Sequence, residues 1–263
     1  MTFIAKKSLG QNFLHAPQVI SAMIHAGEVT PESIVFEVGP GKGALTSKLL
    51  ETGARVLAIE KDDRAIPFLQ EKFSNEIKTG QLEIIHGDVL EFNEGGHEKL
   101  KSGYTLIANI PYYITGEFMR KFLESTHPPK KIVIMVQKEV AKRVVDTKES
   151  ILSISVKAYG EPKYICSVPR KFFRPMPNVD SAVLMIQHIS KSFFEKIDEK
   201  YFFEVLKAGF AHKRKVVIRN LEEKIPKAVL ETIWEKEKLP KDLRAENISL
   251  EVWKKIVGDS LVS

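Results

Sequence analysis

The chain has little cysteine and no long apolar run. Cys166 is the only cysteine among 263 residues, which excludes an internal disulfide and a cysteine-based metal cluster. No run of apolar residues reaches membrane-spanning length. Residues 1–7 lack the apolar segment and cleavage site of a secretory leader. We therefore expect a cytoplasmic protein with no membrane span and no metal.

Acidic residues are absent from three stretches, 1–27, 162–179 and 205–221, in a chain with a net charge of +6. Basic patches of this kind are typical of polyanion-binding proteins, although an ordinary solvated surface explains the charge about equally well. The candidate RNA contacts in these stretches are Lys6, Lys7, Arg170, Lys171, Arg174, Lys213, Arg214, Lys215 and Arg219.

Strand and helix patterns alternate through the first two thirds of the chain. Strands are predicted at 34–38, 55–60, 82–88, 104–108, 131–137, 163–168 and 181–188. Helices are predicted at 17–27, 44–51, 62–74, 115–125 and 150–159, with another starting near 138. This alternation predicts an α/β fold with a mostly parallel, seven-stranded sheet that is covered on both faces.

From about residue 190 the pattern changes to helices alone. Helical periods cover 200–211, 213–223, 226–235 and 248–257. We therefore predict two domains, residues 1–189 and a small all-helical domain at 190–263.

The most informative stretch is 109–113, Asn-Ile-Pro-Tyr-Tyr, directly after a buried strand. The Asn109 carboxamide oxygen and a backbone carbonyl are both acceptors, and Pro111 holds that carbonyl in place. The Tyr112 ring offers a stacking surface for a flat base. Taken alone, the stretch fits a strand end followed by a turn equally well.

Three other strand ends carry features of a nucleoside site. A glycine turn at 39–43 leads from a strand into a helix, where backbone can approach a ligand closely. Glu60 ends the next strand and suits the hydroxyls of a ribose, and Asp88 suits an adenine amino group. The spacing Gly39-x-Gly41-x-x-Ala44 also fits a dinucleotide fingerprint, so a nicotinamide oxidoreductase remains an alternative. The acceptor pair beside Tyr112 favours S-adenosylmethionine.

Six ordered motifs resemble the ribosomal RNA adenine dimethyltransferase family over roughly residues 6–257. Asn-Ile-Pro-Tyr at 109–112 is similar to the Asn-Leu-Pro-Tyr signature of adenine 6-amino methyltransferases. The other similar motifs are 8–14, 37–43, 135–143 and 173–183. The sixth is the C-terminal pair 212–221 and 244–250, which resembles the bacterial small-subunit branch. Ile110 and the Lys-Arg-Lys at 213–215 are minor departures.

The resemblance implies a Rossmann-like class I methyltransferase fold and a role for each matching position. Asn109, Pro111 and Tyr112 would hold the target adenine, and Phe173 would stack on its other face. The alternative for Phe173 is a core aromatic residue before a proline-rich turn. The residues implied to contact S-adenosylmethionine are Asn12, Leu14, Gly39, Gly41, Glu60, Asp88 and Asn109. Without the resemblance, residues 6–14 read as a disordered tail.

The implied activity is dimethylation of two adjacent adenosines in the 3′-terminal hairpin of 16S rRNA, by a monomer. A 23S rRNA dimethyltransferase that confers macrolide resistance shares the catalytic motifs and is one alternative. A ribosome-assembly factor on a methyltransferase fold is another.

Overall fold

The computed structural model describes residues 6, 10–212 and 214–260, and its contacts divide the chain into two units. The first unit comprises the chain up to Lys142 together with Glu161–Ile189. The second comprises Arg143–Gly160 and the chain from Ser190 onward. Within the described part, no helix is long and apolar enough to cross a bilayer.

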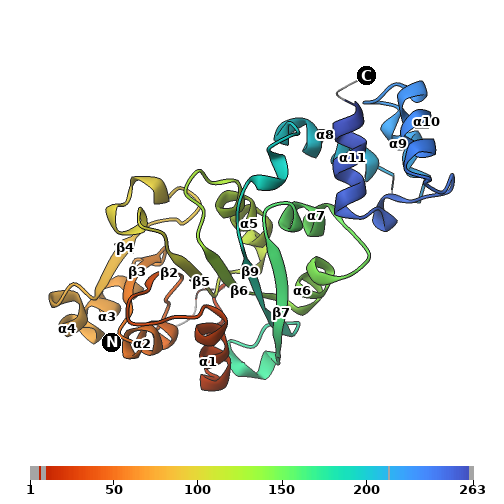
Figure 1. The fold of residues 1–263 in the computed structure, drawn as a ribbon. Coiled ribbons are helices and arrows are strands. Elements are labelled where there is room, and N and C mark those ends of the chain that lie inside the picture. The colour runs from red at the N-terminus through yellow and green to blue at the C-terminus, as the bar shows by residue number, and fades with distance from the viewer. Residues whose placement is uncertain (1–5, 7–9, 213, 261–263) are drawn as a thin grey trace. The chain divides into compact units, whose positions relative to one another are not determined.

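A seven-stranded sheet forms the centre of the first unit, in the order β4-β3-β2-β5-β6-β9-β7 (Figure 1). All neighbouring pairs are parallel except those of β9, which is antiparallel to both β6 and β7. The predicted α/β sheet is therefore confirmed. The strands are β2 (Ile34–Val38), β3 (Arg55–Glu60), β4 (Leu82–His86), β5 (Thr105–Ala108), β6 (Lys131–Gln137), β7 (Glu161–Val168) and β9 (Ser181–Gln187).

Both faces of this sheet are buried, which explains why its strands read as nearly continuous apolar runs. On β2, Val35 joins the core cluster that includes residues of the helices α1 (Pro17–Ala26), α2 (Ala44–Glu51) and α3 (Ala65–Lys72). The next residue, Phe36, points to the other face, where its ring contacts those of Tyr104 and Phe122. Side-chain alternation along one strand thus builds two core layers.

The helices of the first unit follow the predicted pattern with one exception. The helix predicted at about 62–74 is confirmed as Ala65–Lys72, but it ends at Phe73 (φ −114°, ψ 33°), after which a second short helix that was not predicted covers Ser74–Lys78. The buried Phe73 ring packs against the glycine turn, at Gly43, which fixes this break. The helices are α1 (Pro17–Ala26), α2 (Ala44–Glu51), α3 (Ala65–Lys72), α4 (Ser74–Lys78), α5 (Thr115–Glu124) and α6 (Lys138–Val145).

A two-stranded sheet joins the N-terminal segment to a distant loop. Strand β1 (Phe13–Leu14) pairs antiparallel with β8 (Phe173–Arg174). Leu14 is buried in the main core. Residues 10–14 are therefore part of the folded unit and not a disordered tail.

The chain order reverses where β2 lies between β3 and β5. Helices after β2 and β5 connect to neighbours on opposite sides of this point, so the two halves of the sheet wind in opposite directions. Ligands bind at the carboxyl ends of strands at such a switch point. The polar residues that follow β2, β3, β4 and β5 meet at this edge.

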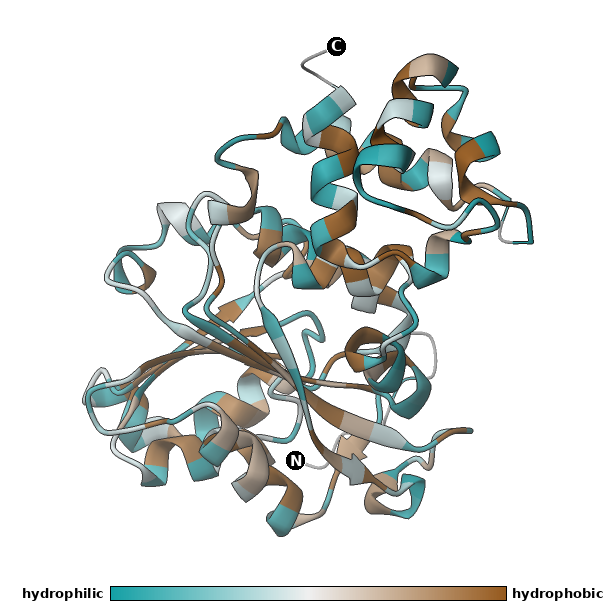
Figure 2. Ribbon diagram, turned by 45° about the vertical axis from the view of Figure 1, so that its right-hand side comes forward, coloured by the Kyte–Doolittle hydropathy of each residue, from teal (hydrophilic) through white to brown (hydrophobic). Residues whose placement is uncertain are grey.

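The second unit is helical. Helix α8 (Glu199–Gly209) buries Phe202, Val205 and Leu206 on one side and leaves Lys207 exposed on the other. Figure 2 shows both hydrophobic and hydrophilic residues along the helices of this unit. Its helices are α7 (Ile151–Lys157), α8 (Glu199–Gly209), α9 (Val217–Leu221), α10 (Lys227–Lys236) and α11 (Leu250–Ser260). The described 3-10 turns of the chain are Glu94–Gly96, Glu98–Leu100, Tyr112–Ile114, Arg170–Phe172, Ser192–Phe194 and Ala245–Asn247.

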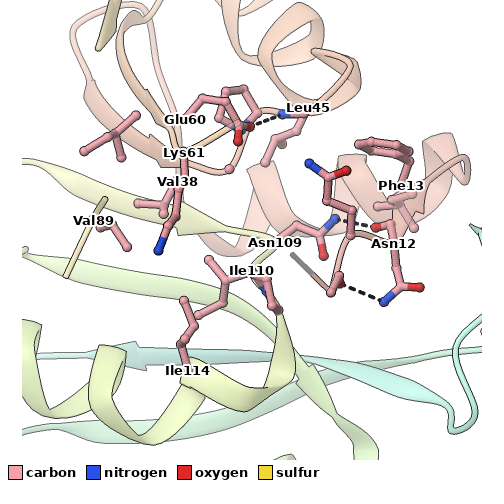
Figure 3. A pocket seen from close by; sticks show the side chains of 18 of the residues that line it. Asn12, Phe13, Val38, Leu45, Glu60, Lys61, Val89, Asn109, Ile110 and Ile114 are labelled. Atoms are coloured by element: carbon pink, nitrogen blue, oxygen red, sulfur yellow. Dashed lines mark hydrogen bonds between the residues drawn. The ribbon is translucent and has the colours of Figure 1, made fainter. Parts of the chain in front are cut away.

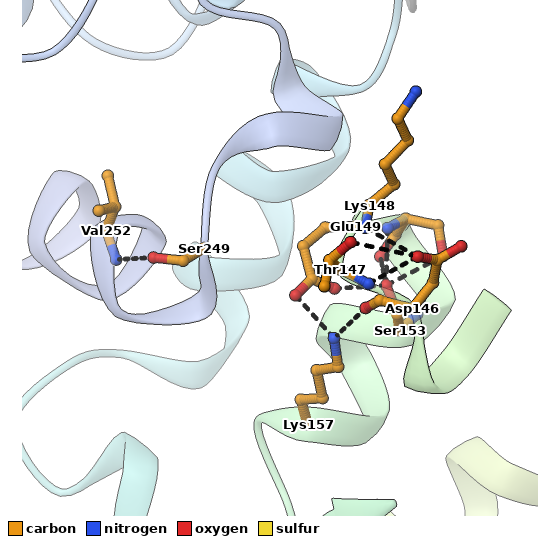
Figure 4. Close-up of polar contacts among 9 residues, drawn as sticks. Asp146, Thr147, Lys148, Glu149, Ser153, Lys157, Ser249 and Val252 are labelled. Carbon is orange, nitrogen blue, oxygen red and sulfur yellow. Dashed lines mark hydrogen bonds and ion pairs between the residues drawn. The ribbon is translucent and has the colours of Figure 1, made fainter. Parts of the chain in front are cut away.

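The segment 143–160 belongs by its contacts to this helical unit. Ser150 and Ser153 form a capping box at the start of α7, and Lys157 binds Glu149 at 2.7 Å (Figure 4). The Glu149 N–H also donates to the carbonyl of Glu246 at 2.8 Å. The predicted domain 1–189 includes this segment, whereas the contacts group it with the C-terminal helices. The division into independently folding domains at 1–189 and 190–263 stays a prediction.

Candidate active site

A cavity of about 410 Å³ opens at the carboxyl ends of β2, β3, β4 and β5 (Figure 3). Its walls come from the N-terminal segment 10–15, the glycine turn and the strand ends. The structure brings together here nine residues predicted from the sequence: Asn12, Leu14, Gly39, Gly41, Glu60, Asp88, Asn109, Pro111 and Tyr112.

The glycine turn between β2 and α2 approaches its neighbours closely. Gly39 and Gly41 have φ of +72° and +56°, a region that side-chain-bearing residues rarely adopt. A Cβ on Gly41 would lie 2.9 Å from the Phe13 ring, and one on Gly39 would lie 3.3 Å from the Asn109 carbonyl oxygen. Glycine therefore leaves the turn's backbone open to the cavity.

Glu60 fixes this turn from the end of β3. Its Oε2 accepts from the Gly41 N–H at 2.9 Å, and its Oε1 accepts from the Asp62 N–H at 2.9 Å. Burial raises the pKa of Glu60, while these two backbone hydrogen bonds oppose the rise. Each carboxylate oxygen keeps a second lone pair that can accept from a ligand hydroxyl.

A hydrogen-bond chain that the sequence did not predict links the N-terminal segment to Glu60. The Gln11 Nε2 donates to Asp62 Oδ2 at 2.7 Å, and the Lys6 N–H donates to Gln11 Oε1 at 2.8 Å. Arg64 forms hydrogen bonds with both oxygens of Asp62 and holds the pKa of that carboxyl well below its usual range. Gln11 thus connects the N-terminal wall of the cavity to Asp62, whose N–H donates to Glu60.

Asp88 is half-buried in the loop after β4 and pairs with Lys61, whose Nζ lies 2.5 Å from Asp88 Oδ2. Burial raises the pKa of Asp88, but the Lys61 bond and the Leu90 N–H outweigh it, so the pKa is lowered. The pair keeps Asp88 ionised as an acceptor. Lys61 was missed from the sequence, although it directly follows Glu60.

The N-terminal segment sets the orientation of the Asn109 carboxamide. Asn109 Nδ2 donates to the Asn12 carbonyl at 3.4 Å, and Asn12 Nδ2 donates to the Gly10 carbonyl at 3.2 Å (Figure 3). Asn109 Oδ1 accepts no hydrogen bond from a described residue and remains an available acceptor. The Ile110 carbonyl is likewise free of bonds within the described ranges.

Pro111 and Tyr112 complete this wall. Pro111 has φ −58° and ψ 137°, and a 3-10 turn begins directly after it. The Tyr112 hydroxyl bonds to the buried Ser181 Oγ at 2.5 Å, and burial raises the pKa of Tyr112. The phenol therefore stays neutral and its ring position is fixed.

The structure places Phe173 in the core of the first unit. Its side chain is only 2% exposed and belongs to the main core cluster, because β8 turns it inward where it pairs with Leu14. It does not line the cavity. This burial favours the alternative, a core aromatic residue that supports β1, and the stacking role stays a prediction.

The candidate RNA contacts that are described are all exposed. They do not line the cavity. They are Lys6, Arg170, Lys171, Arg174, Arg214, Lys215 and Arg219. Lys7 and Lys213 lie outside the described residues. No three His, Cys, Asp or Glu side chains gather as metal ligands in the described part of the chain.

We expect Gly43→Ala to destabilise the protein more than Gly80→Ala. Both glycines have positive φ, +71° and +77°, so each alanine adds a left-handed strain of about 1–2 kcal/mol. A Cβ on Gly43 would also lie 2.5 Å from the Phe73 ring, whereas one on Gly80 meets nothing within 4 Å. Overpacking should cost about 1–3 kcal/mol more at Gly43. Urea unfolding of both variants measures this difference, and equal losses would contradict it.

Glu37 is a buried carboxyl on β2. Neither of its oxygens has a hydrogen-bond partner among the described residues. Burial raises the pKa of Glu37 to about 8, and the charge of Glu60 adds to the shift. The unfolded chain loses this proton near pH 4.5. The folded protein therefore binds more protons than the unfolded chain between pH 4.5 and 8.

From Glu37 we expect a free energy of unfolding that falls as pH rises from about 5 to 8 and then levels off. Each unit of pKa difference corresponds to about 1.4 kcal/mol. Glu37→Gln should flatten the slope and be more stable than the wild type at pH 9. Unfolding curves at several pH values test this, with Glu51→Gln at an exposed position as the control. A slope unchanged by Glu37→Gln would show that Glu37 does not cause it.

Residues 2–258 match the family model described as ribosomal RNA adenine dimethylase. The chain belongs to the ribosomal RNA adenine dimethylase family. Among relatives of this adenine dimethylase, the ribosomal RNA small subunit methyltransferase A of Dehalococcoides mccartyi is 38% identical, covering 97% of this chain and 88% of the relative. The protein of the same name from Bacillus cytotoxicus is 38% identical, covering 95% and 89%.

Solved structures support the fold of this adenine dimethylase. A dimethyladenosine transferase from Plasmodium falciparum has a TM-score of 0.77 and 25% identity, covering 93% of this chain and 95% of that one. The 23S rRNA methyltransferase ErmE has a TM-score of 0.76 at 23% identity, covering 95% and 99%, and supports the fold alone.

Membership of the adenine dimethylase family makes the chain an S-adenosylmethionine-dependent rRNA methyltransferase. The nicotinamide alternative is thereby excluded. The cavity fits this cofactor. The glycine turn leaves its backbone accessible, and the carboxyl groups of Glu60 and Asp88 can accept hydrogen bonds from the cofactor.

Proposed function

We propose that this chain dimethylates the 6-amino groups of two adjacent adenosines in the 3′-terminal hairpin of 16S rRNA during assembly of the small ribosomal subunit. The observation that supports it most is the free acceptor pair, Asn109 Oδ1 and the Ile110 carbonyl, beside Tyr112 on the cavity wall. The relatives with similarity along nearly the whole chain are named small subunit methyltransferases, which favours this substrate over 23S rRNA.

The cofactor contacts are part of this proposal. Glu60 would accept from the ribose hydroxyls, and Asp88 would accept from the adenine amino group. Gly39 and Gly41 would lie against the methionine part, with Asn12 and Leu14 closing the cavity from the N-terminal side. When bound, S-adenosylmethionine supplies an electrophilic methyl group on a sulfonium.

The acceptor pair addresses the weak nucleophilicity of an adenine 6-amino group, whose lone pair is delocalised into the ring. Asn109 Oδ1 and the Ile110 carbonyl would each accept one amino hydrogen. Two acceptors placed in this way favour a pyramidal nitrogen with an available lone pair, so their bonds strengthen toward the transition state. The nitrogen becomes acidic once alkylated, and water can take its proton.

Tyr112 would stabilise the target base outside its stack. A base must leave its neighbours to enter such a cavity, which costs stacking free energy. Stacking on an aromatic ring returns about 1–3 kcal/mol per base. The Tyr112–Ser181 bond holds that ring ready for the base.

The exposed cations Arg214 and Lys215 would contact RNA phosphates. We expect the Arg214→Ala/Lys215→Ala double variant to bind small-subunit RNA more weakly and with a flatter salt dependence. Each phosphate contact contributes about 0.7–0.9 to the slope of log K against log salt, so the pair should lower it by roughly 1.5.

The control for this measurement is Lys227→Ala/Lys236→Ala, which removes the same charge from lysines paired with Glu231 and Asp259. An equal change in slope for both double variants would mean that only total charge matters and that Arg214 and Lys215 are not specific contacts.

We further propose that the protein acts as a monomer in the cytoplasm. The substrate is tested by incubating the protein with labelled S-adenosylmethionine and with small and large ribosomal particles that lack the modification. Label in the small-subunit RNA supports the proposal. Label only in large-subunit RNA would assign the chain to the resistance enzymes, and no label with cofactor bound would leave an assembly factor.

A further inference from the structure

The loop between β8 and β9 exposes apolar side chains. Met176 is 58% exposed and Val179 is 44% exposed. They stand out, because the described part of the chain has only two other exposed large hydrophobic residues, Tyr113 (69%) and Ile151 (38%). This loop, residues 175–179, has no role in the site described above.

Both ends of the loop are anchored to the cavity wall. Before the loop, Arg174 pairs with Phe13 in the two-stranded sheet, and Phe13 lines the cavity. After it, Ser181 Oγ bonds to the hydroxyl of Tyr112, the proposed stacking residue. The exposed apolar tip therefore emerges beside the place where the target base would enter.

The backbone of the loop is braced. The Arg170 N–H donates to Asp180 Oδ1 at 2.9 Å, and Arg170 Nη1 donates to the Asn178 carbonyl at 3.3 Å. The Lys138 N–H donates to the Asp180 carbonyl at 3.0 Å. Pro175 and Pro177 restrict φ on either side of Met176. The side chain of Met176 is thus presented to solvent from a fixed backbone.

The surroundings of the loop suit RNA. Arg170, Lys171 and Arg174 are exposed just before it, in a stretch without any acid from 162 to 179. Cations contact phosphates, and an apolar tip contacts the faces of bases. Proteins that deform nucleic acid frequently insert an apolar side chain such as Met or Leu between stacked bases.

We propose that Met176 is a positioning residue that enters the gap left in the RNA stack by the extruded adenosine. The inference rests on the proposed function, because it requires an RNA whose target adenosine is stacked. By occupying the gap, Met176 keeps the adenosine from restacking while Tyr112 holds the extruded base. Its contribution therefore depends on whether the target begins stacked.

The test uses an RNA hairpin with the fluorescent analogue 2-aminopurine at the target position, whose emission rises when it leaves the stack. The full chain is compared with Met176→Ser, Met176→Leu and the control Ile151→Ser, which makes the same change at another exposed apolar position (38% exposed). Methyl transfer is measured in parallel on the adenosine hairpin and on a single strand of the same sequence.

At saturating protein, we expect the wild type, Met176→Leu and Ile151→Ser to raise the fluorescence equally, and Met176→Ser to raise it much less. On the hairpin, kcat of Met176→Ser should fall about tenfold, as expected if the side chain supplies part of the unstacking free energy. On the single strand, kcat of Met176→Ser should match that of the wild type.

Three results would overturn the inference. One is a Met176→Ser variant that behaves like Ile151→Ser, and another is an equal loss on hairpin and single strand. The third is a loss seen only on assembled particles, which would assign the loop to a ribosomal protein. A wild type that methylates neither RNA nor particle would instead refute the proposed function, so the two failures are distinguishable.

Discussion

Asn109→Ala is expected to lower kcat for methyl transfer by about 10²–10³-fold, the loss typical when one preorganised hydrogen-bonding group is removed from a transition state. The variant loses the free Oδ1 acceptor on the cavity wall, while the Ile110 carbonyl remains. Glu60 and Asp88 are untouched, so affinity for the cofactor should change little. Single-turnover methyl transfer and calorimetric titration with S-adenosylmethionine measure the two quantities separately.

The control for this prediction is Asn75→Ala, at an exposed position on α4 outside the cavity. It should match the wild type in both measurements. Near-normal turnover by Asn109→Ala would show that the carboxamide is not the acceptor that activates the amine. A loss of cofactor affinity with normal turnover would assign Asn109 to the cofactor alone.

Glu60→Gln is expected to weaken cofactor binding by about 100-fold or more, because hydrogen bonds to a charged acceptor contribute about 1.5–3 kcal/mol each. The carboxylate accepts from the backbone N–H groups of Gly41 and Asp62. In the amide, an NH₂ group would face one of these donors. The glycine turn would then lose a fixed contact at the same time as the ribose loses a charged acceptor.

Glu94→Gln provides a matched control for this change, because Glu94 and Glu60 are both 7% exposed. Glu94 binds Ser125 and Lys121 and does not line the cavity. Its variant should leave the dissociation constant of S-adenosylmethionine unchanged. If Glu60→Gln bound as tightly as Glu94→Gln, the proposed ribose contact would be wrong.

The sequence predicted the cavity residues whose place depends on the end of a single strand. Glu60 ends an apolar strand, and Asn109 and Asp88 follow two others. Parallel strands end at one edge of a sheet, so the meeting of these three residues follows from the pattern. Asn12 and Leu14 came from the family resemblance alone, since a segment rich in Lys, Ser and Gly has no periodicity of its own.

The sequence could not predict contacts between short segments that are far apart. Two-residue strands such as β1 and β8 carry no periodic signal, so the burial of Phe173 against Leu14 was missed. The break at Phe73 depends on packing against Gly43, which no local propensity contains. The Gln11–Asp62 bond likewise exists only once the N-terminal segment lies against β3.

In the proposed reaction, the cavity presents an adenine 6-amino group to the methyl donor through Asn109 and Ile110. The most direct measurement is the identity of the methylated atom, found by digesting the labelled small-subunit RNA to nucleosides and analysing them by mass spectrometry. We expect N6,N6-dimethyladenosine at two adjacent positions near the 3′ end, and loss of this product in Asn109→Ala. Methyl groups on a ring nitrogen or a ribose oxygen would contradict the proposed reaction.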